Sequence, residues 1–368
     1  MRLCYIANAN SIHTRRWVAP FVQRGDEVHV LSYMRVTRPW PEVALVDLTQ
    51  LPGPPRGKRY YWAYWLRNYL HRTRPDILHA HQVTIAGWLG ALTGYHPFVI
   101  SAWGSDLLLE PKRSRWRRWK TRFALNRCDA LTAPSPLLVE AALKLDVPRE
   151  RVHLIPWGVE TDVFTPIPDD RLATRRRFGI DPEAKVIFSP RGLKRVYNQD
   201  ILIQAAAQIA PDSPSIHLCF LDFNADLDYK DALRQQLSDA GLTSHVHWLP
   251  AQPDMAAMAR LYRMADAVVS IPSSEGYGFS VYEALACGAP TLITDLPIFQ
   301  HVLTNEEHVL KTPVRDVAST AQALQRLLTD AVLRERLCRN GLALVQSLSI
   351  ARRIHLTKAL YSELLASP

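Results

Sequence analysis

The sequence predicts an α/β protein with two doubly wound parallel sheets, one in each of two domains. Three observations lead to this fold class. The chain has 368 residues, which exceeds the roughly 100–200 residues of one ordinary domain. Short β-rich apolar runs alternate with longer helical patterns, as they do in βαβ units. A proline-rich connector at residues 164–170 separates two such series.

The first half of the chain contains seven runs that we expect to be strands. Each run is apolar on both faces, which is typical of a parallel sheet covered by helices. The runs are residues 3–7, 28–31, 43–48, 77–80, 98–101, 130–133 and 152–155. We therefore expect a first domain over residues 1–164.

The second half repeats this pattern after the connector. Its expected strands are residues 186–189, 216–221, 245–249, 267–271 and 291–293. They predict a second domain over residues 165–350. Residues 351–365 have the pattern of a final helix, and the pattern alone leaves open whether the segment 351–368 packs with the second domain or back on the first.

Composition narrows the class of protein. Apolar residues make up 48% of the chain and charged residues 21%, as in a globular protein. The five cysteines are far apart, without the spacing of a zinc site or a disulfide framework, so a reducing cytoplasm is expected. The sequence contains no run of about 18 apolar residues, so no membrane span is expected. The first residues resemble a strand more than a leader peptide.

The positive charge is concentrated in the first half. Of the net +9, residues 1–164 carry 23 Lys and Arg against 13 Asp and Glu, and the remainder carries 21 against 22. Two segments, residues 56–67 and 111–122, mix these bases with aromatic residues, among them Arg115, Trp116, Arg118 and Trp119. We favour contact with an anionic membrane surface, while a solvated basic face and nucleic acid remain the alternatives.

The most informative segment spans residues 273–290. It places Glu275 after an expected strand, then a glycine turn, and then a helix from Phe279 that ends near Gly288. A helix N-terminus behind a glycine turn suits a diphosphate, because its N–H groups and dipole attract anions. Glu283, about one turn inside the helix, is placed to accept hydrogen bonds from a ribose diol, and Glu275 to meet the group attached to the phosphates.

The spacing Glu275-x7-Glu283, followed by ALACGAP, resembles the EX7E segment of retaining GT-B glycosyltransferases of family 4, the glycosyl transferases group 1. Residues 24–30, 76–81, 103–107 and 155–164 resemble further segments of that family. The resemblance implies two Rossmann-like domains that face each other across a cleft, with the donor in the second domain and the acceptor in the first.

The resemblance also implies residue roles. Glu283 would hold the donor ribose, and Glu275 would contact the transferred sugar. Arg191 would bind the diphosphate and stabilise the charge that builds on it as it leaves. The remaining donor-binding residues would be Tyr277 and the backbone N–H groups of Gly278, Phe279 and Ser280.

The sequence departs from the family pattern in three places. Tyr197 and Asn198 stand where the family has Lys-Gly, so a shifted Lys194 is the candidate for the second phosphate charge. Trp103 stands where the family often has a histidine, and the resemblance would place it, with Asn10, His13 and Asp106, on the acceptor side of the cleft in the first domain. The loop after the first strand has Asn10 and His13 in place of paired glycines, and His13 is either a contact to diphosphate or acceptor or a capping residue.

Together these observations predict a retaining hexosyltransferase. The donor would be a UDP- or GDP-sugar, and the acceptor a glycan, lipid-linked or other hydroxyl compound. We expect no cofactor and no metal, because no DxD carboxylate pair precedes a strand end; we also expect no nucleic acid, and a cytoplasmic or peripheral membrane location. The alternatives are a sugar-nucleotide epimerase of the same architecture and a basic nucleic-acid- or membrane-binding module without transferase activity.

Overall fold

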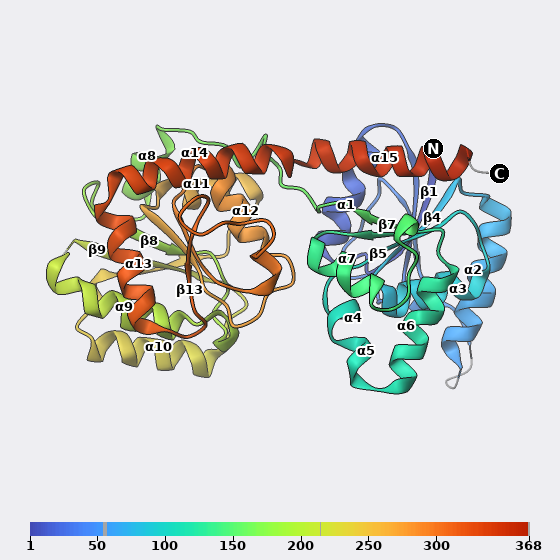
Figure 1. Cartoon of the computed structure of the whole chain (residues 1–368), viewed down its shortest axis with the longest axis horizontal. Coiled ribbons are helices and arrows are strands. Elements are labelled where there is room, and N and C mark those ends of the chain that lie inside the picture. The colour runs from blue at the N-terminus through green and yellow to red at the C-terminus, as the bar shows by residue number, and fades with distance from the viewer. Residues whose placement is uncertain (54–56, 214, 367–368) are drawn as a thin grey trace. The chain divides into compact units, whose positions relative to one another are not determined.

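The computed structural model describes residues 1–53, 57–213 and 215–366, and these residues form two compact units (Figure 1). Unit 1 consists of Met1–Trp157 together with the chain from Ala351 onward, and unit 2 of Gly158–Ile350. The first division thus falls at Trp157, before the expected boundary at residue 164. None of the helices in the described ranges is long and apolar enough to cross a membrane.

Unit 1 is built on a seven-stranded sheet in which every strand pair is parallel. Its order is β3-β2-β1-β4-β5-β6-β7. The strands are β1 (Arg2–Ala7), β2 (Glu27–Ser32), β3 (Ala44–Asp47), β4 (Ile77–His81), β5 (Phe98–Ser101), β6 (Ala130–Ala133) and β7 (Val152–Leu154). All seven expected strands are confirmed, with ends that move by one or two residues.

The helices of unit 1 lie on both faces of this sheet, as the parallel topology requires. They are α1 (Ile12–Gln23), α2 (Lys58–Thr73), the π-helical turn η2 (Val83–Gly87), α3 (Trp88–Thr93), α4 (Ser105–Leu108), α5 (Glu110–Arg113), α6 (Arg115–Arg127), α7 (Pro136–Leu143) and the final helix α15 (Ile350–Ala366).

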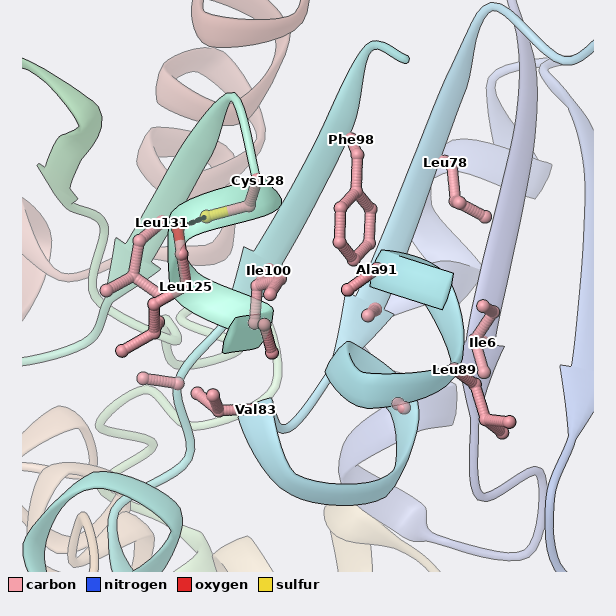
Figure 2. Packing of buried hydrophobic residues seen from close by; sticks show 14 of the residues in the cluster. Ile6, Leu78, Val83, Leu89, Ala91, Phe98, Ile100, Leu125, Cys128 and Leu131 are labelled. Atoms are coloured by element: carbon pink, nitrogen blue, oxygen red, sulfur yellow. Dashed lines mark hydrogen bonds between the residues drawn. The ribbon is translucent and has the colours of Figure 1, made fainter. Parts of the chain in front are cut away.

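One face of the sheet packs against α3 and α6 (Figure 2). Leu89 and Ala91 of α3 lie over Ile6 and Phe98 of the strands, and all four side chains are nearly or fully buried. Gly90 allows this close approach, because a Cβ atom there would lie 2.4 Å from Cζ of Phe98. Burial of each large apolar side chain stabilises the unit by roughly 1.5–3 kcal/mol.

The other face is completed by α15, which comes from the far end of the chain. Its Tyr361 is fully buried, with its hydroxyl 2.5 Å from Nδ1 of His79 and 3.3 Å from the hydroxyl of Tyr5. Arg353 of the same helix donates to the backbone carbonyl of Trp17 and lies over the Trp17 ring. The final helix therefore belongs to the core of unit 1.

Unit 2 carries a six-stranded, fully parallel sheet in the order β10-β9-β8-β11-β12-β13. Its strands are β8 (Lys185–Ser189), β9 (Ile216–Asp222), β10 (Val246–Pro250), β11 (Ala267–Ser270), β12 (Thr291–Thr294) and β13 (Leu310–Thr312). The five expected strands are confirmed. The sixth, β13, was missed because it has only three residues, with Lys311 between its two buried positions.

Four helices of unit 2 have clear N-terminal signals. Asp226, Asp254, Asp316 and Asp330 each cap a helix by accepting a backbone hydrogen bond. The helices are α8 (Asp170–Arg177), α9 (Gln199–Ile209), α10 (Leu227–Asp239), α11 (Met255–Met264), α12 (Phe279–Ala286), α13 (Val317–Thr329) and α14 (Ala331–Ser347). They enclose a second apolar core around Ile187, Phe220 and Leu292.

Candidate functional site

The site in unit 2 begins at the point where the strand order reverses. β8 and β11 are neighbours, with Phe188 opposite Val268. The next strand after β8 is added on one side of this pair, as β9, and the next strand after β11 is added on the other side, as β12. Parallel sheets of this topology bind ligands outside the carboxyl ends of such a strand pair. The loop after β8 carries Arg191 and the loop after β11 carries Glu275, so both residues lie at this edge.

The turn between β11 and α12 depends on a glycine. Gly278 is the N-cap of α12 and has φ +86°, a left-handed conformation that favours glycine. A Cβ atom at Gly278 would also lie 2.6 Å from Cζ of Phe299. The predicted helix is confirmed from Phe279, and Gly288 follows its end with φ +71°. The N-terminus of α12, with its positive dipole end, is therefore fixed beside the two loops.

Arg191 connects these elements. Its Nη1 lies 2.9 Å from Oε2 of Glu275 and donates to the hydroxyl of Ser280, at 3.2 Å, in the first turn of α12. Its guanidinium also lies over the ring of Tyr197, at 4.2 Å. Burial lowers the pKa of Arg191, but its interactions with Glu275, Tyr197 and Tyr262 together outweigh burial, so the pKa is raised. Arg191 thus presents a fixed positive charge next to the helix N-terminus.

Glu283 is buried on α12, and its position is set by a tyrosine from another helix. The hydroxyl of Tyr262, on α11, donates to Oε2 of Glu283 at 2.9 Å. Burial, together with the adjacent carboxylate, raises the pKa of Tyr262 well above its ordinary value. Tyr262 therefore stays protonated and holds one oxygen of Glu283 in place.

The structure explains why asparagine can stand at position 198, where the family has a glycine. Asn198 adopts the left-handed conformation, with φ 55°, that a glycine would supply and that asparagine tolerates. Its amide donates to the carbonyl of Ile271 and to the hydroxyl of Ser273, which joins the loop after β8 to the loop after β11.

Lys194 and Tyr277 were also predicted to contact the donor. Lys194 is half-buried ahead of a short 3-10 turn, and its ammonium forms no ion pair with any described carboxylate. Tyr277 is buried, and its ring packs against those of Phe279 and Tyr282. The geometry therefore gives Tyr277 a packing role and leaves the role of Lys194 a prediction.

In unit 1, His13 and Trp103 meet in an aromatic cluster. The His13 ring lies 6.0 Å from that of Trp103 and 5.3 Å from that of Trp157. Trp103 also lies 5.6 Å from His81, at the end of β4. Asn10 lies apart from this cluster: its side chain bonds to the backbone of Arg35 and Thr37.

Asp106 is buried and organises the loop around it. Its carboxylate accepts hydrogen bonds from the backbone N–H groups of Val83, Trp103 and Gly104. Burial raises the pKa of Asp106, and these N–H groups counteract it. Asp106 thus fixes the segments that follow β4 and β5, where the sequence suggested a contact to the acceptor.

The predicted membrane-facing residues lie on α6. Trp116 and Trp119 stack with ring centroids 4.8 Å apart, and they are 59% and 49% exposed. Arg115 and Arg118, on the same helix, are also exposed. The other basic segment was expected to start at Arg56, which lies outside the described residues; its helix, α2, begins at Lys58. Among the residues that the structure describes, no group of three or more metal-ligating side chains is placed to hold a metal ion.

Two family models match almost consecutive parts of the chain. Residues 11–163 match the model described as Glycosyltransferase Family 4, and residues 170–343 match that of Glycosyl transferases group 1. The chain belongs to the group 1 glycosyltransferases.

Curated relatives of this glycosyltransferase include enzymes named D-inositol 3-phosphate glycosyltransferase. The protein from Jonesia denitrificans is 29% identical over 51% of this chain and 46% of its own length. The protein from Nocardia farcinica is 30% identical over 54% of this chain and 43% of its own length. The chain therefore spans less than half the length of these relatives.

Solved structures share the fold over the whole chain. Alr3699/HepE from Anabaena, in complex with UDP, aligns with a TM-score of 0.84 and 18% identity, covering 99% of this chain and 100% of its own. Sucrose-phosphate synthase from Thermosynechococcus elongatus aligns with a TM-score of 0.80 and 20% identity over the full length of both chains. At this identity the likeness establishes the GT-B fold of the glycosyltransferase.

Three contributors to the site of this glycosyltransferase were missed in the sequence. Tyr262, Tyr197 and the Ser280 side chain each contact a predicted residue. Ser280 stands three residues before Glu283, so its place in the first turn was predictable. Tyr262 lies 21 positions before Glu283 on a different helix, and no local pattern signals that contact.

Proposed function

We propose that this chain transfers a glycosyl group from a nucleoside diphosphate sugar to a hydroxyl acceptor. The observation that carries the proposal is the cluster at the switch point of unit 2, where Arg191 and Glu275 meet the N-terminus of α12. A fixed cation beside a helix N-terminus suits a diphosphate, and Glu283, inside the same helix, suits the ribose.

We favour UDP over GDP as the nucleotide of the donor. Among the proteins with the same fold, HepE has been solved with UDP and with UDP-glucose. The curated relatives are named for a phosphorylated acceptor, inositol 3-phosphate. These names support a UDP-sugar donor and a hydroxyl acceptor that carries an anionic group.

The proposed reaction breaks the bond between the anomeric carbon and the diphosphate and forms a bond to the acceptor oxygen. The acceptor proton passes to the leaving diphosphate on the same face of the sugar, which gives retention. Arg191 and the α12 N-terminus stabilise the charge that grows on the diphosphate, without a metal ion. Glu275 orients the transferred sugar, while Glu283 anchors the ribose.

The acceptor is proposed to be a glycan or lipid-linked compound that the protein meets at an anionic membrane surface. The exposed tryptophans of α6 and its exposed arginines support this location, since aromatic and basic side chains together suit the bilayer interface. Attachment would be peripheral and reversible.

Donor binding tests the proposal first. Thermal shift with UDP and with GDP should show stabilisation by UDP, because a ligand that binds only the folded state raises its stability. Turnover of a labelled UDP-sugar should persist in EDTA, and NMR of the first product should show the anomeric configuration of the donor. Arg191→Ala should lower turnover more than UDP affinity.

Several results would contradict the proposal. If neither nucleotide binds, the donor site is wrongly assigned. Conversion of the UDP-sugar to its epimer, with no product attached to an acceptor, would favour an epimerase. An inverted product or a requirement for metal would reject the proposed chemistry while leaving the transferase intact.

A further inference from the structure

A hollow of about 540 Å³ lies within unit 1 at the carboxyl ends of β4 and β5. Its lining includes Gln82 and Thr84, which follow β4, and Ser105, which follows β5. It also includes Arg59 of α2, and Arg117 and Lys120 of α6. We call this the basic hollow. All three cations belong to the two basic segments, residues 56–67 and 111–122, for which we favoured membrane contact.

The charges around the basic hollow are not balanced by its carboxylates. Glu110 is already paired with Arg113 and Arg117, and the Asp106 carboxylate accepts the backbone hydrogen bonds described above. Arg59 and Lys120 form no ion pair with any carboxylate among residues 1–53, 57–213 and 215–366. Burial, together with Arg59 and Arg117, lowers the pKa of Lys120. An anion in the hollow would relieve this repulsion.

The neutral part of the lining suits a phosphate oxygen. Thr84 and Ser105 contribute hydroxyl groups. Oε1 of Gln82 accepts from the hydroxyl of Tyr33 at 3.1 Å, so the amide NH₂ of Gln82 remains a donor. Gln82 also has φ 81° and ψ 139°, a strained conformation of the kind that clusters at ligand sites.

We propose that the basic hollow binds a phosphate group carried by the acceptor. This deepens the proposed function, on which it rests, by assigning a chemical class to the acceptor. The volume exceeds that of one phosphate and lies within the range of ligand pockets, so part of the attached molecule also fits. Trp116, exposed in the lining, offers a face to that part.

Isothermal titration of the full chain with inorganic phosphate and with glycerol 3-phosphate tests the inference, with saturating UDP present. Lys120→Gln and Arg59→Gln should each weaken binding about tenfold, because each removes a charge-assisted contact. Arg118→Gln is the matched control, since Arg118 lies on the same helix but outside the hollow and should leave phosphate binding unchanged.

A variant that is expected to strengthen phosphate binding separates an effect on binding from general damage to the fold. Glu110→Gln frees Arg117 from its carboxylate partner and should tighten phosphate binding. Thermal unfolding identifies any variant that fails to fold. Because loss of binding in Lys120→Gln locates the phosphate in unit 1, the result stands whether or not UDP binds unit 2.

The source of the phosphate is distinguished with vesicles. Phosphatidylcholine vesicles that contain phosphatidic acid should bind less well to Lys120→Gln if the acceptor is a lipid phosphate. If the acceptor is soluble, Lys120→Gln should weaken binding of inorganic phosphate and glycerol 3-phosphate and leave vesicle binding unchanged. The inference is overturned if phosphate binding is unchanged in Lys120→Gln and Arg59→Gln, or if Arg118→Gln weakens it equally, as a diffuse basic surface would.

Discussion

The ion pair between Arg191 and Glu275 makes a specific prediction about the stability of unit 2. Arg191→Ala removes a guanidinium 2.9 Å from a carboxylate whose side chain is only 13% exposed. At an effective dielectric constant of about 20, the gross attraction at that distance is about 6 kcal/mol. Removal of one partner from a buried pair costs roughly 3–5 kcal/mol. Since both side chains keep some exposure, we expect Arg191→Ala to cost about 2–3 kcal/mol.

Glu275→Gln should cost less, about 1 kcal/mol, because Arg191 keeps its contacts to Ser280 and Tyr197. The double variant should cost less than the sum of the two single variants, since it leaves no unpaired buried charge. The assay is urea unfolding followed by fluorine NMR of protein labelled with 5-fluorotryptophan. Trp248 is the only tryptophan in residues 158–350, so its resonance reports unit 2.

Trp248→Phe assigns that resonance, and the nine tryptophans outside residues 158–350 serve as the internal control. Additive costs in the double variant would refute the reasoning, because they would mean that Arg191 and Glu275 are energetically independent. A loss of stability in unit 1 alone would refute it as well.

Three further predictions concern the donor, pH and the membrane. Glu283→Ala should weaken UDP binding by roughly 1.5–3 kcal/mol in isothermal titration, and unchanged affinity would reject its assignment to the ribose. Burial lowers the pKa of His79 to about 3, so its stabilising contribution is complete above about pH 6.5 and is lost as the pH falls toward the folded value. His79 alone should account for a loss of about 2 kcal/mol in unit 1 between about pH 7 and pH 5. Burial also lowers the pKa of the neighbouring His81 well below its ordinary value, so His79→Gln should reduce the loss without abolishing it in urea titrations followed by tryptophan fluorescence. Vesicle flotation should show binding that needs anionic lipid, falls with salt, and weakens by about 1 kcal/mol for each of Arg115→Glu and Arg118→Glu. Indifference to anionic vesicles at low salt would reject membrane docking.

Local patterns in the sequence were sufficient for most of the fold. Strands such as β1 and β11 are apolar on both faces and end at polar or turn residues, so they were located to within two residues. β13 was missed because three residues with a lysine in the middle have no distinctive period. The start of α12 was predictable, because Gly278 and the apolar run after it act over neighbouring positions.

Contacts between distant segments were not predictable in the same way. The sequence placed Arg191 and Glu275 at strand ends, but their pairing with each other depends on β8 and β11 being neighbours. Likewise, the basic hollow combines α2 and α6 with loops after two strands. Each of its cations resembles an ordinary surface residue until the sheet brings the segments together.

The contribution of α15 to unit 1 has a consequence for biosynthesis. Tyr361 and Arg353 fill the core beside His79 and Trp17, yet they are synthesised about 200 residues after Trp157, the end of the first part of that unit. Unit 2 is continuous and can fold as it leaves the ribosome, since domains tend to fold as units during synthesis. Unit 1 cannot complete its core until α15 has been synthesised. A nascent chain that stalls after α14 should therefore contain a folded unit 2 and an incomplete unit 1. The uncovered apolar face of unit 1 would then be a binding site for chaperones.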